Sequence, residues 1–341
     1  MPKKLSRREF LKAGALGLAG TLGVAAAGKL ASNPPAGHGQ HDGPGHDGGP
    51  HGMAGPVGEV DHEKNGFNPS ELLTDFDYGK VSRMPSGQRL REYEILSHNK
   101  TIEVMPGINF AAWTFNGRIP GPTLRATEGD RIRIHFTNGS DHPHTMHFHG
   151  IHPSKMDGVP PLLVDPGKGF VYEFDALPFG LHQYHCHAFP LARHIAKGLY
   201  GAFIIDPKGG RPQVDHEFVM VMSGFDVDFD DANDFYQVNG IPFHYQMNPI
   251  PIRVNETVRI YLVNMLEFDL INSFHLHANF FHYYPTGTSL TPTEYTDTII
   301  LGQAQRGILE FSYSYPGIYM FHAHVTEFTE LGWSGHFDVQ P

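Results

Sequence analysis

Two stretches of the chain alternate apolar and polar side chains, and each stands at the same point of a repeated pattern. Residues 129–138 (GDRIRIHFTN) follow an Asn-Gly turn at 116–117, and residues 255–264 (NETVRIYLVN) follow a similar turn at 239–240. Alternation predicts strands, and Asn-Gly predicts tight turns. A His-x-His segment follows each strand, and a second one comes later. The sequence therefore predicts one β-rich unit that occurs twice.

The composition agrees with an all-β fold. The 341 residues include 39 Gly and 27 Pro, and 40% of them are apolar, which allows two packed cores with many turns. Long helical patterns are few. We predict two tandem β-sandwich domains, residues 60–208 and 212–341, with the Pro- and Gly-rich junction 207–212 between them.

The first 59 residues have the composition of an export signal followed by a linker. Arg7 and Arg8 precede a short Gly- and Ala-rich apolar stretch, which is typical of a twin-arginine signal over residues 1–27. That stretch is too short and Gly-rich for stable membrane insertion. Residues 28–59 predict a disordered linker whose histidines either capture metal ions or are merely solvated. We expect an exported protein, periplasmic or secreted, and the net charge of −11 argues against nucleic acid as a partner.

Histidine and cysteine are used unusually. There are 24 histidines and a single cysteine, Cys186, so a disulfide within the chain is excluded. Alternate residues of a strand face the same side, so a His-x-His pair presents two imidazoles side by side. Four such pairs, two in each domain, predict a shared metal cluster, since histidine is the commonest metal ligand. The pairs are His147 and His149, His185 and His187, His275 and His277, and His322 and His324.

The same alternation predicts a second site inside the first domain. Cys186 stands between two cluster-facing histidines, and His144 is an odd number of residues from His147, so both face the other way. His194 follows a short Pro-containing loop and can fold back. Two imidazoles and one thiolate are the ligands of a blue-copper electron-transfer site. Leu199 stands where an axial Met is usual, which predicts a trigonal site of raised reduction potential.

The second domain has positions equivalent to those of the inner site, but other residue types occupy them. Asn272 stands three residues before a His-x-His pair, as His144 does, and Ala323 stands where the first domain has Cys186. The sequence therefore predicts one electron-accepting copper per chain, located in the first domain.

Taken together, these motifs resemble those of the multicopper oxidases. Residues 144–150 (HTMHFHG), 184–187 (YHCH) and the two later pairs are similar to the two-domain, laccase-like branch with its type 1 copper in the first domain. The resemblance covers residues 75–341. It implies cupredoxin-like Greek-key sandwiches, about four coppers per chain, and oxidation of a reducing substrate coupled to reduction of O₂ to water. The implied ligands are His144, Cys186 and His194 for type 1, His147 and His275 for type 2, and His149, His185, His187, His277, His322 and His324 for the type 3 pair.

The resemblance also implies an assembly and a proton supply. Two domains of one chain cannot easily surround one cluster, so it implies a homotrimer with clusters between the first domain of one subunit and the second domain of its neighbour. Acids near the cluster relay protons in the family. Asp157 matches the type 2 side, and Glu327 and Glu330 are candidates on the type 3 side, although each fits an exposed loop carboxylate as well.

The donor and two rival functions stay open at this point. The donor is a phenol, an aromatic amine or a metal ion, and the lack of a Met-rich segment favours organic donors. A copper-containing nitrite reductase has similar domains but a single catalytic copper on three histidines, whereas eight paired histidines favour three coppers. A non-catalytic copper-binding or electron-transfer protein would need only the ligands of the inner site.

Overall fold

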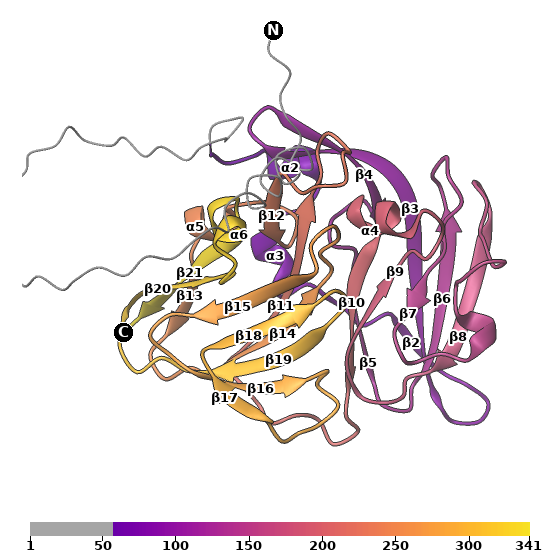
Figure 1. Ribbon diagram of the computed structural model, residues 1–341. Helices are drawn as coiled ribbons and strands as arrows, with labels where there is room; N and C mark the ends of the chain where they lie inside the picture. The colour runs from indigo at the N-terminus through magenta and orange to yellow at the C-terminus, as the bar shows by residue number, and fades with distance from the viewer. Residues whose placement is uncertain (1–56) are drawn as a thin grey trace, which may run out of the picture. The chain divides into compact units, whose positions relative to one another are not determined.

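The computed structural model describes residues 57–341, whose regular structure is mostly β-strand (Figure 1). The expected signal, residues 1–27, and nearly all of the expected linker, residues 28–59, lie outside the described part. The all-β prediction is confirmed, because the helices are short and the strands form four sheets. Within residues 57–341, no helix is long and apolar enough to cross a membrane.

Two sheets make up the first sandwich. One has the order β1-β5-β10-β9-β7, and the other has the order β2-β3-β6-β8, with β4 paired to β3. The strands are β1 (Phe76–Asp77), β2 (Lys80–Arg83), β3 (Arg89–Met105), β4 (Ile108–Phe115), β5 (Thr123–Thr127), β6 (Arg131–Asn138), β7 (His147–Phe148), β8 (Gly169–Asp175), β9 (Gly180–His185) and β10 (Tyr200–Asp206).

Two further sheets make up the second sandwich, in the orders β12-β11-β14-β19-β16-β17 and β13-β21-β20-β15-β18. The strands are β11 (His216–Phe225), β12 (Phe235–Val238), β13 (Ile250–Arg253), β14 (Val258–Asn264), β15 (Ile271–Leu276), β16 (Phe281–Pro285), β17 (Glu294–Thr296), β18 (Thr298–Gly302), β19 (Arg306–Phe311), β20 (Gly317–His322) and β21 (Ser334–Gln340). The helices are α2 (His62–Asn65), α3 (Pro69–Leu72), the 3₁₀ turn η1 (Ser154–Met156), α4 (Leu191–Ala196), α5 (His244–Met247) and α6 (Thr326–Glu330).

Burial explains why the two predicted strands differ in how strictly they alternate. In β6 the apolar side chains of Ile132, Ile134 and Phe136 are buried, whereas the polar residues between them are partly exposed. Every residue of β14 is buried. One face of β14 packs inside the second sandwich, and its other face, with Tyr261 and Val263, packs against the first domain. A strand that is covered on both faces needs no polar face.

Three hydrophobic clusters hold the described chain together. One fills each sandwich, and a third joins the two domains through residues of β3, β4 and β10 on one side and β11 and β14 on the other. Strand β9 is tied to the second domain as well. Gln183 donates to the backbone oxygen of Ala304 at 2.6 Å, and Arg306 donates to that of Leu181 at 2.8 Å. The domains therefore pack against each other through both apolar and polar contacts.

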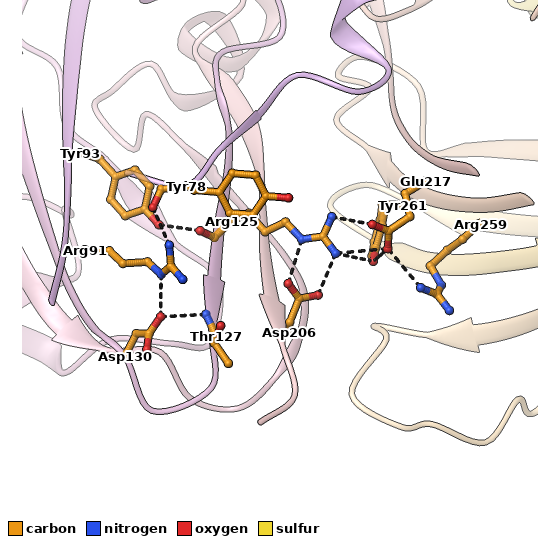
Figure 2. Close-up of polar contacts among 10 residues, drawn as sticks. All are labelled: Tyr78, Arg91, Tyr93, Arg125, Thr127, Asp130, Asp206, Glu217, Arg259 and Tyr261. Atoms are coloured by element: carbon orange, nitrogen blue, oxygen red, sulfur yellow. Dashed lines mark hydrogen bonds and ion pairs between the residues drawn. The ribbon is translucent and has the colours of Figure 1, made fainter. Parts of the chain in front are cut away.

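A partly buried ion-pair network also crosses between the domains (Figure 2). Arg125 of β5 donates to Asp206 of β10 and, across the domain boundary, to Glu217 of β11, at 2.8 Å in each case. Glu217 also accepts hydrogen bonds from Tyr261 at 2.7 Å and from Arg259 at 3.1 Å. One carboxylate thus accepts from three donors of both domains, and its loss would remove these contacts while Arg125 keeps Asp206 and Arg259 keeps Glu310.

Candidate metal centre

Three donor atoms meet inside the first sandwich. The Nδ1 atoms of His144 and His194 lie 3.1 Å apart, and Cys186 Sγ lies 3.7 Å and 3.2 Å from them, respectively. His194 comes from α4, and His144 is held by an isolated β-bridge to Val164. All three ligand candidates are buried. The structure thus places these residues together in a compact triangle.

Burial sets the protonation of this triangle. It lowers the pKa of His144 to about 3 and that of His194 to about 4, so both imidazoles are neutral and can act as ligands. Burial raises the pKa of the Cys186 thiol to about 11, so the thiolate needs a cation beside it. Two neutral imidazoles and a buried thiol are the donor set of a type 1 copper site, and they fit that metal.

Leu199 belongs to the same buried apolar cluster as Cys186. Its side chain is fully buried, and its backbone oxygen accepts a hydrogen bond from the Cys186 amide at 3.0 Å. The Thr145 amide donates to Cys186 Sγ at 3.4 Å, which orients the sulfur. A side chain without sulfur at position 199 offers no axial ligand of the usual kind.

Four more histidines of the first domain gather on the opposite side of β9. His149 and His185 face each other with their Nε2 atoms 2.9 Å apart, and the ring centroid of His147 lies 5.3 Å from that of His185 and 5.2 Å from that of His187. The Nδ1 atom of His187 is buried without a hydrogen-bond partner. We call these four residues the first half-site.

The second domain carries a matching group, the second half-site, made of His275, His277, His322 and His324. Its equivalent Nε2 atoms, on His277 and His322, also lie 2.9 Å apart. The ring of His275 lies 5.3 Å from that of His322 and 5.2 Å from that of His324, the same spacings as in the first half-site. In each half-site, ligand nitrogens of three histidines lie within 4.8 Å of one another, close enough to hold a metal ion.

Backbone oxygens fix how the half-site rings are turned. Nδ1 of His147 donates to the backbone oxygen of Asp157 at 2.9 Å, and Nδ1 of His275 donates to that of Asp297 at 3.0 Å. Bonds of this kind fix the tautomer, so that Nε2 remains available to a metal. The sequence did not reveal Asp297, because it lies 22 residues after His275, whereas Asp157 lies only 10 residues after His147.

The expected proton-relay acids differ in their surroundings. A carboxylate oxygen of Asp157 lies 2.9 Å from His147 Nδ1 and 3.3 Å from His152 Nε2, so Asp157 is part of the first half-site's surroundings. Glu327 and Glu330 are exposed on α6. That helix contacts the second half-site through Thr329, whose Oγ1 lies 3.2 Å from His322 Nδ1.

The second domain has core packing where the first has the cysteine site. Asn272 accepts a hydrogen bond from the buried Trp333 indole at 3.0 Å, and Ala323 is fully buried in the same apolar cluster. Only the first domain therefore presents an inward-facing thiol and two imidazoles.

An aromatic cavity of about 510 Å³ lies beside His194, and we call it the donor cavity. Trp113 packs against His194, with ring centroids 4.7 Å apart, and also lines the cavity. The exposed Phe189 and, from the second domain, Phe229 form other parts of its wall. Sequence reasoning missed this cavity, because its residues come from distant loops.

Comparison with known proteins agrees with this geometry. Residues 97–210 and 215–341 match two family models, both described as multicopper oxidase. The chain belongs to the multicopper oxidases. A crystal structure of a multicopper oxidase is 58% identical with a TM-score of 0.81, and the match covers 83% of this chain and 100% of that chain. Proteins of this family bind type 1, type 2 and type 3 coppers, and the described clusters are compatible with them.

Relatives with other activities are also similar. The copper-containing nitrite reductase of Neisseria meningitidis is 31% identical over 245 residues, 66% of this chain and 63% of that protein. Laccase-2 of Botryotinia fuckeliana is 38% identical over 123 residues, 34% of this chain and 20% of that protein. The chain thus spans less than two thirds of the length of these curated relatives.

Proposed function

We propose that this multicopper oxidase takes electrons one at a time from a reducing donor beside His194 and delivers them to O₂ at a cluster between the half-sites. One observation carries the proposal: eight histidines form two half-sites of equal internal spacing, and a buried cysteine lies directly behind one of them. Copper in these sites supplies one-electron redox chemistry and the reduction of O₂.

The chain itself provides the connection between the two kinds of site. Cys186 is covalently joined to His185 and His187, so its sulfur and the first half-site are linked by one residue of backbone on either side. In addition, His185 Nδ1 donates to the backbone oxygen of Cys186 at 2.9 Å. This short route supports electron transfer out of the buried thiolate site toward the cluster.

The assembly we propose is a homotrimer in which each cluster lies between two subunits. Among residues 57–341, no ring contact joins a histidine of one half-site to one of the other. In the second half-site, His277 and His324 are exposed in the single chain. Exposed isoleucines stand on the same sheet, namely Ile271, Ile300 and Ile318. A partially apolar face around exposed ligands supports a subunit contact there.

A complementation experiment tests both the oxidase and its assembly. His149→Ala disables the first half-site, and His277→Ala disables the second, so each variant alone should consume no O₂. When differently tagged variants are co-expressed, a mixed trimer should contain an interface with two intact halves and recover activity. Tagged wild-type chains serve as the control. If purified mixed trimers stay inactive, or if an isolated copper-loaded monomer consumes O₂, the proposal fails.

For the proton supply, we propose Asp157 as the main relay beside the first half-site. Its carboxylate contacts both His147 and His152, which supports proton movement from solvent to the cluster. For Glu327 and Glu330 the support is weaker, since both are exposed. We further propose that phenols and aromatic amines are the donors and that the protein is exported by the twin-arginine route, periplasmic or secreted.

A second candidate function is nitrite reduction. The observation that favours it is the 31% identity to the copper-containing nitrite reductase of Neisseria meningitidis. The copper-loaded protein should be assayed with nitrite and a reduced donor in the absence of O₂. Turnover of nitrite together with no reduction of O₂ would replace the oxidase proposal.

A further inference from the structure

The donor cavity carries positive charge in an otherwise acidic protein. Arg193 and Lys197 line it together with His194, and no carboxylate lines it. The whole chain has a net charge of −11. Within residues 57–341, neither Arg193 nor Lys197 forms an ion pair with a carboxylate. Two cationic side chains in the wall of an aromatic cavity, without a carboxylate ion-pair partner in this part of the chain, attract anions and repel cations.

The nearest carboxylates already have other partners. Asp141 lines a neighbouring cavity, where its carboxylate accepts hydrogen bonds from Asn99 at 2.6 Å and from His142 at 2.6 Å. Asp226 and Asp231 line a small space that borders Arg193 and Lys197, and the Asp226 carboxylate accepts the amides of Asp230 and Asp231 at 3.0 Å. These acids therefore lie outside the donor cavity and are held by local bonds.

A loop of the second domain contacts both cations. Phe229 has a left-handed backbone, with φ of 60°, and its ring lies 4.1 Å from Lys197 Nζ and 5.8 Å from the Arg193 guanidinium carbon. Lys197 also lies over the Trp113 ring at 5.1 Å and donates to the backbone oxygen of Ala111. With Phe110 at 5.8 Å as well, Lys197 packs against three rings, whereas the Arg193 side chain is exposed and can contact a ligand.

We infer that the donor cavity selects aromatic anions, such as phenols that carry a carboxylate, over neutral phenols, cationic amines and metal ions. The inference rests on the proposed function and names its donor class. The aromatic ring would lie among Trp113, Phe189 and Phe229 beside His194, with its carboxylate toward Arg193. On oxidation the donor gives one electron, which is passed on to O₂, and releases its phenolic proton to solvent; four such electrons and four protons convert one O₂ into two waters, and the carboxylate is unchanged.

Binding is tested first, without turnover. Calorimetric titration of the copper-loaded protein with 3,5-dimethoxybenzoate and with 3,5-dimethoxybenzyl alcohol compares an anion with a neutral ligand of the same shape, neither of them a phenol. The anion should bind more tightly, and Arg193→Gln should weaken its binding by about three- to fivefold, the worth of one partly exposed charge contact. Arg193→Lys should restore much of it, and Lys80→Gln, an exposed charge on β2, should leave it unchanged.

Kinetics then tests selection among real donors. The quantity compared is kcat/KM for syringate divided by kcat/KM for 2,6-dimethoxyphenol. Arg193→Gln should lower this ratio by raising the KM for syringate. Added salt should lower the same ratio in the wild type. Equal binding of both calorimetric ligands, or an unchanged ratio in Arg193→Gln, overturns the inference. An absence of O₂ consumption with every donor would instead refute the proposed oxidase, while the calorimetric result would still decide the charge selection.

Discussion

Replacing Glu217 with Gln should destabilise the contact between the two domains. Burial alone would raise the pKa of Glu217, but hydrogen bonds and charge attraction from Arg125, with further bonds from Tyr261 and Arg259, lower it from 4.5 to about 2. Each pH unit of that difference is worth about 1.4 kcal/mol, so the carboxylate stabilises the folded chain by about 3 kcal/mol before solvent screening. Since 27% of the Glu217 side chain is exposed, we expect a loss of about 2 kcal/mol.

The pH dependence has a definite sign. The pKa is depressed in the folded state, so the stabilisation is fully present above pH 4.5 and is lost as the pH falls toward 2. Between pH 5.5 and 3.5 the difference in unfolding free energy between wild type and Glu217→Gln should shrink by about two fifths. The Gln variant cannot titrate at this position and therefore lacks this part of the pH dependence.

Urea denaturation of the copper-loaded protein, followed by tryptophan fluorescence at both pH values, measures the effect. Asp75→Asn is the matched control, since it breaks an ion pair with Arg118 whose carboxylate side chain is 53% exposed. That control should cost under about 1 kcal/mol. A Glu217→Gln variant as stable as the control, or a difference that grows as the pH falls, would refute the reasoning.

Three further variants probe the metal sites. Cys186→Ser should abolish the blue absorption and donor oxidation while the half-sites keep their copper, as seen by optical spectroscopy and metal analysis; loss of all copper would contradict separate sites. Asp157→Asn keeps the backbone oxygen that holds His147, so turnover should fall about a hundredfold with copper retained; an unchanged O₂ consumption rate would remove its role. Gly158→Ala adds a methyl group 2.1 Å from the backbone oxygen of Met146 at a φ of +69°, so thermal unfolding should occur at lower temperature and copper should be lost from the half-site; normal copper content would show that the loop adapts.

The amino-acid sequence was sufficient to predict which residues group together wherever that grouping depends on strand alternation. Two-residue periodicity separates Cys186 from His185 and His187, and the structure places its sulfur with His144 and His194 instead. The repeat likewise predicted matching histidine pairs in the second domain, where the ring spacings agree with those of the first. The side of a strand that a residue faces is a local property, so the pattern within one strand is enough to predict it.

The remaining features depend on contacts between distant segments. Asp297 reaches His275 only because the short segment between β17 and β18 lies over β15, and no motif marks that residue. Phe229 enters the donor cavity from the other domain on a left-handed backbone that its residue type does not suggest. Arg125 and Glu217 look like ordinary surface charges in the sequence, yet they join the domains. Tertiary packing decides all three.

Metal analysis of the purified, copper-loaded protein, with its optical spectrum, tests the central claim most directly. The account predicts about four coppers per chain, an intense blue band from the thiolate site and a near-ultraviolet shoulder from a coupled copper pair. Copper content of about two per chain without the shoulder would mean that the half-sites do not build a trinuclear cluster. Nitrite, rather than O₂, would then be the acceptor to test.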